Sequence, residues 1–506
     1  MLHQTNYRRG AQRHSRHGRD LTGTISLNRR ASELRQQLQD RGPEHSCFGL
    51  YLASRIDILP AEVCRELALI TDAAAPIPAA GIRNMIVQEL GHHWERSITD
   101  FEETPCESTL ISQSHRAWLR TGTAVKLMVL RPQYHTGPAL IGADLLADYC
   151  DGRTIARVLA DFNAALSRKT NFLVLRDALE SMRQDAANFD LLQSHASYPE
   201  LSSTRLLAVE DKEEMTLAQA ADIDSRDNEL LAARLCHVWL YQALQGHCFP
   251  VDAQLHNILL NHANQLSFVQ CDLVGLPSGV KENISNYFGA MLADDPDRAS
   301  TYLLREMERP VNVKTDFEAF RTGFRQAAYF GMLEPVLGTR SDTIPQMVFQ
   351  HCKLALNHGY IPRAHLLCFY RGFFSTARIA YKLAPHGDPM REGLTELRIT
   401  SSFTQVRTMM DWRHWYENSD RFASALLHLP RTIDDALTRA ATLHQPAIHT
   451  DKVAATRQAQ RTFLLELLVL LALISICFFE TGIQSQKTIL LILLIAGFLL
   501  LRQRET

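Results

Sequence analysis

Residues 249–275 read FPVDAQLHNILLNHANQLSFVQCDLVG, and this stretch predicts a short β-hairpin. Residues 258–260 and 266–270 have the apolar character of two strands, and the sequence NHANQ between them is rich in turn-forming residues. The two ends of a hairpin lie side by side, so polar side chains on its two flanks come close together in space. A site of defined chemistry is therefore expected here.

Three polar residues flank this hairpin: Asp252 and Asn257 lie before it, and Asp272 follows it. Two carboxylates and an amide are oxygen donors suited to Mg²⁺, which proteins hold through a few carboxylates together with phosphate oxygens. The spacing of Asp252 and Asn257 equals the D-x-x-x-x-N of a kinase catalytic loop, and Asp272 then takes the position that holds metal. In this interpretation Asp252 is a catalytic base or a second metal contact. The alternatives are a helix N-cap for Asp272 and a turn residue for Asn257.

The chain upstream of this hairpin predicts an α+β protein. Helical patterning dominates residues 61–95, and residues 111–129 predict a hairpin that turns at Thr121-Gly122. Helical stretches follow, then the strand-like RLLAVE at 205–210 and another helix around residues 230–245. We expect a small sheet followed by a helical half.

The last forty or so residues have a different composition. Residues 463–479 and 488–501 are almost entirely apolar on every face, which favours a pair of transmembrane helices over a buried hairpin of a soluble core. Basic residues flank the outer ends of the pair (Lys452, Arg457, Arg461, Arg502, Arg504). The positive-inside rule then places both termini in the cytoplasm.

Composition excludes several other classes of protein. The 506 residues include 53 Lys and Arg against 55 Asp and Glu, so the chain has no global charge for a nucleic-acid backbone, and we expect no nucleic-acid partner. The ten cysteines form no CxxC pair, which indicates a reducing compartment and neither a zinc site nor a disulfide framework. Residues 1–41 are rich in Arg but have no apolar core, so they are not a signal peptide.

Several segments together resemble one family. GPEHSCFGLYLASRIDILPAEVCREL is similar to GPxFxKxGQxxSxRxDxLPxE, ISQSHRA to IAQVHRA, AVKLMVLRP to VAVKVxRP, MRQDAAN to xRREAAN, and FPVDAQLHNILL to FHADxHPGNIxV. These are motifs of the UbiB/AarF family of atypical protein-kinase-like proteins, which support ubiquinone (coenzyme Q) biosynthesis, and the resemblance spans residues 42–389.

The resemblance implies a two-lobe protein-kinase-like fold with a helical N-terminal extension and a C-terminal transmembrane helical hairpin. The expected parts are a basic arm (1–41), the helical extension (42–104), an N-lobe (105–215), a C-lobe (216–395), a helical linker (396–460) and the transmembrane pair (461–503). The body and both termini would lie on the cytoplasmic side of a bacterial-type inner membrane.

The resemblance also implies ATP and Mg²⁺ as cofactors. Asp252 would be catalytic, Asn257 and Asp272 would hold metal, and the residues that contact the nucleotide would be Lys126, Ser112 and Gln113.

The sequence departs from the family's motifs at positions expected to contact the nucleotide. The opening motif's Lys and Gln fall on Cys47 and Leu50, the phosphate-binding Lys on Met128 and its helical Glu partner on Leu179. Lys126 lies two residues before Met128 on the same strand face. Glu107 stands in the loop that would cover the phosphates, where its charge would repel them.

We therefore expect a membrane-anchored atypical kinase or ATPase that supports ubiquinone biosynthesis or handles quinones or lipids. Its partners would be membrane lipid and ubiquinone-biosynthesis proteins or quinone precursors. The alternative is a catalytically impaired pseudokinase that acts as a membrane scaffold or regulatory binding protein. A third hypothesis, a small-molecule phosphotransferase, leaves the opening motif and the tail unexplained.

Overall fold

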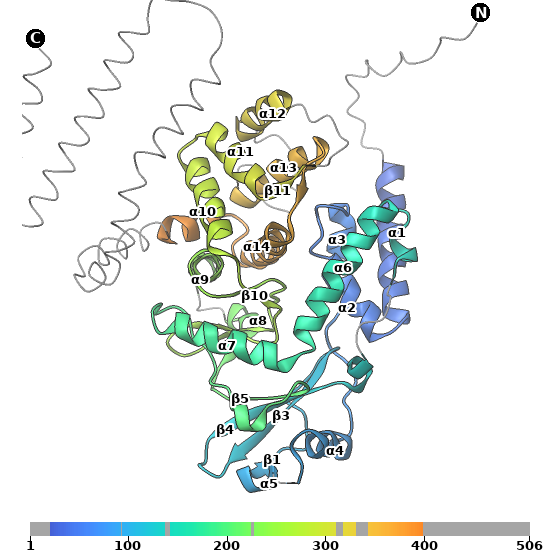
Figure 1. The fold of residues 1–506 in the computed structure, drawn as a ribbon, viewed down its shortest axis with the longest axis vertical. Helices are drawn as coiled ribbons and strands as arrows, with labels where there is room; N and C mark the ends of the chain where they lie inside the picture. Colours follow the sequence, from blue (N-terminus) through green and yellow to red (C-terminus); the bar gives the residue numbers. More distant parts are fainter. Residues whose placement is uncertain are drawn as a thin grey trace, which may run out of the picture. The chain divides into compact units, whose positions relative to one another are not determined.

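The computed structural model describes residues 21–92, 94–136, 142–223, 227–309, 317–329 and 343–397 (Figure 1). The expected transmembrane pair at 461–503, the linker from 398 onward and the first 20 residues lie outside this range. Within it, no helix combines the length and the apolar character needed to cross a membrane.

A small antiparallel sheet forms the lower part of the molecule in Figure 1. Its order is β1-β3-β4-β5, with β2 paired to β3. The strands are β1 (Ile98–Phe101), β2 (Glu107–Ser108), β3 (Ser112–Leu119), β4 (Ala124–Leu130) and β5 (Leu206–Glu210). The turn between β3 and β4 contains Gly122 with φ of 84°, a conformation that favours glycine. The predicted hairpin and the strand RLLAVE are thus present, and the sheet begins at Ile98, a few residues before the expected N-lobe boundary.

Two helices follow β4 in sequence and end next to the hairpin region. α6 (Gly152–Lys169) is capped by Asp151, which accepts from the Thr154 amide, and α7 (Phe172–Ala186) is capped by Asn171, which accepts from the Leu173 amide. Only two residues separate the helices, so the chain turns sharply and the basic last turn of α6 stays close to the start of α7. α7 packs on β5 and also contacts β10 (Leu273–Val274).

The helical half is built on α9 (Asn228–Leu244) and α14 (Ala364–Leu383), which pack on each other. Trp239 stands at the centre of this core, packs against Phe369 and Phe373, and donates from Nε1 to the carbonyl of Pro250 at 2.8 Å. The remaining helices of this half are α8 (Leu217–Ala221), α10 (Ser278–Leu292), α11 (Pro296–Arg305), α12 (Phe317–Tyr329) and α13 (Ile344–Asn357).

Three N-terminal helices lie beside α6 (Figure 1): α1 (Leu21–Asp40), α2 (Pro43–Leu52) and α3 (Ala61–Leu67). α4 (Ala79–Leu90) and α5 (Trp94–Ser97) pack on the sheet instead. Phe48 and Tyr51 of α2 lie with their ring centroids 4.9 and 5.3 Å from that of Phe162 of α6. This aromatic contact fixes α2 against α6 and so brings the opening motif to the edge of the hairpin site.

Candidate functional site

Two short ladders bring the three predicted residues together. β7 (Phe249–Pro250) pairs with β10 in a register that places Pro250 opposite Leu273. Asp252 lies two residues after Pro250 and Asp272 lies directly before Leu273, so the two aspartates come close together. The Asp272 amide donates to Oδ1 of Asp252 at 2.7 Å. β8 (Ile258–Leu260) pairs with β9 (Leu266–Phe268), as expected, and also with β6 (Met215–Thr216).

Asn257 is fixed by the backbone around it. Its Oδ1 accepts from the Gln254 amide at 2.7 Å, and its carbonyl accepts from the Val269 amide at 2.9 Å. The side chain is buried and lines the same pocket as the two carboxylates. The three residues therefore form one polar cluster.

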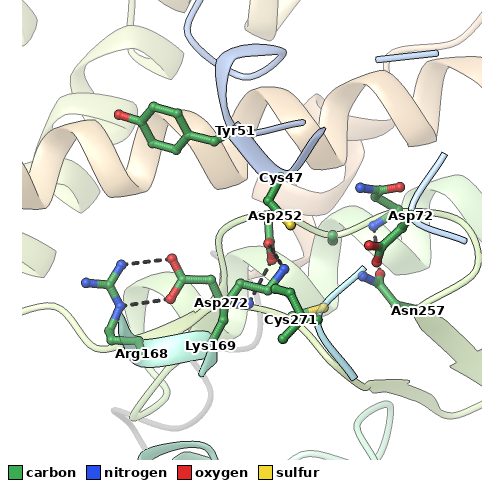
Figure 2. A network of polar contacts seen from close by, with 12 residues as sticks. Cys47, Tyr51, Asp72, Arg168, Lys169, Asp252, Asn257, Cys271 and Asp272 are labelled. Carbon is green, nitrogen blue, oxygen red and sulfur yellow. Dashed lines mark hydrogen bonds and ion pairs between the residues drawn. The ribbon is translucent and has the colours of Figure 1, made fainter. Parts of the chain in front are cut away.

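Both carboxylates of the cluster are held by cations from the last turn of α6. Arg168 donates from Nε and an Nη to the two oxygens of Asp272, each at 2.8 Å, and Nζ of Lys169 lies 2.7 Å from Oδ2 of Asp252 (Figure 2). The Asp272 side chain has 0% of its surface exposed, and that of Arg168 has 30%. A buried carboxylate needs a partner of opposite charge, and here the protein itself supplies it. We call Arg168 and Lys169 with their two carboxylates the α6 clamp.

Opposite charges within the clamp favour the ionised forms of Lys169, Asp252 and Arg168. Burial alone disfavours charged Lys169, but the charge of Asp252 outweighs it and raises the pKa of Lys169 above its usual value. Burial likewise acts to raise the pKa of Asp252, and Lys169 outweighs it, so that pKa is lowered. For Arg168, the bond to Asp272 overcomes burial and the pKa is raised.

A polar pocket lies between the clamp, α2 and α14; we call it the carboxylate pocket. Its walls include Cys47, Tyr51, Asp72, Lys169, Asp252, Asn257, Asp272, Arg371 and Arg378. Burial, followed by the charge of Asp72, raises the pKa of the Cys47 thiol to about 12, so Cys47 is a neutral group at the place where the resemblance expects a lysine. Tyr51 donates to Asp161 at 2.6 Å, and Asp161 also lies 3.6 Å from Arg371. The clamp lysine is the cation that faces Asp252.

A second, larger pocket lies between the sheet and the β8–β9 hairpin; we call it the interlobe cleft. It comprises about 1180 Å³ of non-atom space, open solvent at its mouth included. Lys126 and Met128 of β4 both line it, which confirms that they share a strand face. Lys126 is half-buried and has no hydrogen bond or ion pair to another described residue, although its charge acts on Glu107 in the same cleft.

The other charged groups near Lys126 do not replace the missing helical glutamate. Leu179 lines the cleft from α7, whereas Glu180 points away and pairs with Arg183 at 2.7 Å. Asp185 accepts from the ring and the amide of His247 at 2.6 and 2.7 Å. Glu107 lies in the cleft and accepts from Gln270, and burial raises its pKa.

Ser112 and Gln113 line neither the interlobe cleft nor the carboxylate pocket. Gln113 is fully buried, and its amide bonds to both the N–H and the carbonyl of Ile77, at 2.7 and 2.9 Å. Ser112 is buried against Thr109. The structure thus uses this pair to tie the segment before α4 to the sheet, and does not bring it to the predicted nucleotide position.

The sequence did not predict that Arg168 and Lys169 pair with the two carboxylates. A basic pair in the last turn of a helix is common, because it complements the helix dipole, so the pair carries no signal of its own. α7 begins three residues after Lys169 and contains most of the motif MRQDAAN, but this motif does not indicate where the last turn of α6 lies.

The comparisons with known proteins agree with the fold. Residues 69–303 match the family model of the ABC1 atypical kinase-like domain. The protein "Probable protein kinase UbiB" of Shewanella pealeana is 28% identical over 344 residues, which is 64% of this chain and 60% of the relative. The protein of the same name from Shewanella woodyi is 29% identical over 344 residues with the same coverage. The match thus spans about 60% of the length of these relatives.

Two solved structures are more distant. The complex of Rv3197 with erythromycin from Mycobacterium tuberculosis has 14% identity and a TM-score of 0.39, and covers 69% of this chain and 97% of its own. The Rio2 kinase–ADP/Mg²⁺-phosphoaspartate complex from Chaetomium thermophilum has 11% identity and a TM-score of 0.25, with 62% and 96% covered. The family model, together with the small sheet and the helical half, confirms the predicted kinase-like fold. These findings support a divergent member of the UbiB family, which in residues 69–303 is similar to the ABC1 atypical kinase-like domain.

Proposed function

We propose that this protein binds ATP in the interlobe cleft and supports ubiquinone biosynthesis as a UbiB-type atypical kinase-like protein. The observation that carries the first part is Lys126, a half-buried cation that lines the cleft and makes no hydrogen bond or ion pair with a described residue. A polyphosphate would give its ammonium group a direct anionic contact. The second part rests on the similarity to proteins named UbiB.

The carboxylate cluster has the oxygen donors of a Mg²⁺ site, but it lacks the net negative charge that such a site needs. Both oxygens of Asp272 bond to Arg168, those of Asp252 bond to Lys169 and the Asp272 amide, and Oδ1 of Asn257 bonds to the Gln254 amide. Two cations already compensate two carboxylates, so a divalent cation entering this arrangement meets their repulsion. In the clamped arrangement the residues do not fit Mg²⁺. Asn257 and Asp272 as metal ligands therefore stay a prediction that requires Arg168 to leave.

In this proposal the chain's own residues have definite tasks. Lys126 would contact phosphate oxygens. Asp252, oriented by Lys169 and by the Asp272 amide, would accept a hydrogen bond from a hydroxyl or water in the carboxylate pocket. Since Lys169 lowers the pKa of Asp252, this carboxylate is a weak base, and we expect slow turnover.

A pseudokinase is the second candidate, and specific contacts favour it. Met128 and Leu179 place apolar groups in the cleft where the resemblance expects a lysine and its glutamate, and the α6 clamp holds both carboxylates. In this case the protein would bind nucleotide without hydrolysing it.

The membrane anchor remains part of the proposal. The apolar runs at 463–479 and 488–501 would tether the kinase-like body to the cytoplasmic face of an inner membrane, with anionic lipid and quinone-biosynthesis proteins or quinone precursors as partners.

The test is ATP binding by the purified full chain, followed by ATPase activity in lipid vesicles. We expect wild type to bind a fluorescent ATP analogue and Lys126→Met to bind it about tenfold more weakly, since a charge-assisted hydrogen bond is lost. Lys353→Met is the matched control, because Lys353 of α13 lines neither the cleft nor the carboxylate pocket. Absence of binding by wild type would refute the proposal, whereas binding without hydrolysis would select the pseudokinase.

A further inference from the structure

A third pocket lies between α14 and the segment from α2 to α3, next to the carboxylate pocket. Its cavity volume of about 330 Å³ is at the lower end for a small-molecule pocket. We call it the α3–α14 pocket.

The charges that line the α3–α14 pocket all have one sign. Arg65, Arg378 and Lys382 contribute to its wall, and among the described residues no aspartate or glutamate does. Arg65 is partly compensated by Glu62, whose carboxylate lies 3.2 Å from its guanidinium group outside the pocket. The pocket thus carries a net positive charge.

Arg378 is the unusual member of this set. It is half-buried, and its guanidinium group has neither a hydrogen bond nor an ion pair within the described part of the chain. Asp161 pairs with Arg55 and Arg371. Burial lowers the pKa of Arg378, and the opposing influence comes from Cys64, a thiol whose own pKa burial raises to about 12. A neutral thiol does not neutralise the charge of an arginine, so an anionic ligand would provide the counter-charge that Cys64 does not.

The rest of the wall is apolar or already satisfied. Ile56, Ala61 and Phe374 present hydrocarbon surface. The hydroxyl of Ser375 donates to the carbonyl of Ala253 at 2.7 Å, and that of Ser54 donates to the carbonyl of Tyr51 at the same distance. Arg65 pairs with Glu62 and Lys382 is exposed, so the half-buried donor available to a ligand in this wall is the guanidinium fork of Arg378, whose geometry matches a carboxylate or phosphate.

We propose that the α3–α14 pocket binds an amphiphilic anion, with its carboxylate or phosphate head on Arg378 and its apolar body along Ile56, Ala61 and Phe374. Arg378 and the two serines also line the carboxylate pocket, so the bound head lies at the boundary between the two pockets. The proposal goes beyond nucleotide binding and does not depend on it, because none of these residues lines the interlobe cleft.

The test is calorimetric titration of the full chain with octyl phosphate, octanoate, inorganic phosphate and octyltrimethylammonium. Both octyl anions should bind, inorganic phosphate should bind at least about tenfold more weakly because it lacks the apolar body, and the cation should not bind. Equal binding of the cation, or no binding of either octyl anion, would overturn the proposal.

Variants locate the site. Arg378→Gln should weaken octyl phosphate about tenfold or more, Arg378→Lys should restore part of the affinity, and Ala61→Phe should block the pocket without removing a charge. Arg183→Gln, an exposed residue of α7, is the control and should leave the affinity unchanged. An affinity that neither Arg378→Gln nor Ala61→Phe alters would place the ligand elsewhere and refute the inference.

Vesicles separate the two sources of such an anion. If the ligand is a lipid headgroup, vesicles of phosphatidylglycerol should compete with octyl phosphate for wild type but not for Arg378→Gln. If it is a free amphiphile, octyl phosphate should bind in an Arg378-dependent way and the vesicles should not compete.

Discussion

Replacing Arg168 by alanine breaks the α6 clamp, and the contacts of the clamp allow the loss of stability to be predicted. The substitution removes two hydrogen bonds of 2.8 Å and leaves the Asp272 carboxylate, with none of its surface exposed, without a counter-charge. Breaking a fully buried ion pair costs roughly 3–5 kcal/mol. Because 30% of the Arg168 side chain is exposed, water can enter the vacated space, and we expect a loss of about 3 kcal/mol in the free energy of unfolding.

Magnesium should reverse part of this loss. In Arg168→Ala the carboxylates carry a net negative charge, so Asp272 and Asn257 become available as oxygen ligands. At a Mg²⁺ concentration about tenfold above its Kd, the stabilisation is about 1.4 kcal/mol. Wild type, with its carboxylates already compensated, should gain much less.

The assay is urea unfolding of the full chain, followed by tryptophan fluorescence, with and without Mg²⁺ and with Ca²⁺ as a second cation. Arg183→Ala is the control, since it breaks an exposed ion pair worth at most about 1 kcal/mol. A loss below about 1 kcal/mol in Arg168→Ala, or equal stabilisation of wild type and variant by Mg²⁺, would refute the reasoning.

Three further predictions concern single side chains. Lys126→Met should weaken ATP by about tenfold and leave the unfolding midpoint unchanged, measured by titration and by thermal unfolding. Lys169→Met should be less stable than wild type between about pH 4 and pH 10: the lowered pKa of Asp252 gives stability that is lost as the pH falls below about 4, and the raised pKa of Lys169 gives stability that is lost above about pH 10. A stability difference between Lys169→Met and wild type that peaks outside this range would contradict the ion pair. Arg378→Met should raise the thermal midpoint of the ligand-free protein, because it removes a half-buried charge that has no partner among the described residues; a lowered midpoint would show that Arg378 has a structural partner.

The sequence predicted local features well. The β3–β4 hairpin, β5 and the β8–β9 hairpin each show their pattern within a few residues, and the shared face of Lys126 and Met128 follows from the two-residue period of a strand. The outward direction of Glu180 was also within reach, because Leu175, Leu179 and Met182 mark the buried face of α7 at helical spacing.

Features that depend on tertiary placement were out of reach. β7 and β10 have two residues each, too few to show a period, yet their pairing joins Asp252 to Asp272. Arg168 and Asp272 are 104 residues apart in the sequence, and no local pattern predicts their contact. Ser112 and Gln113 match a family motif, but the motif does not show that Gln113 bonds to Ile77 instead of facing the cleft.

The magnesium dependence of ATP binding tests the central claim most directly. ATP affinity of wild type and Arg168→Ala should be measured by calorimetry with Mg²⁺ and with EDTA. The account predicts that wild type binds ATP with nearly the same affinity in both conditions, and that Arg168→Ala binds it more tightly when Mg²⁺ is present. Wild type that binds ATP only with Mg²⁺ would contradict the clamp, and wild type that binds no ATP in either condition would contradict the proposed function.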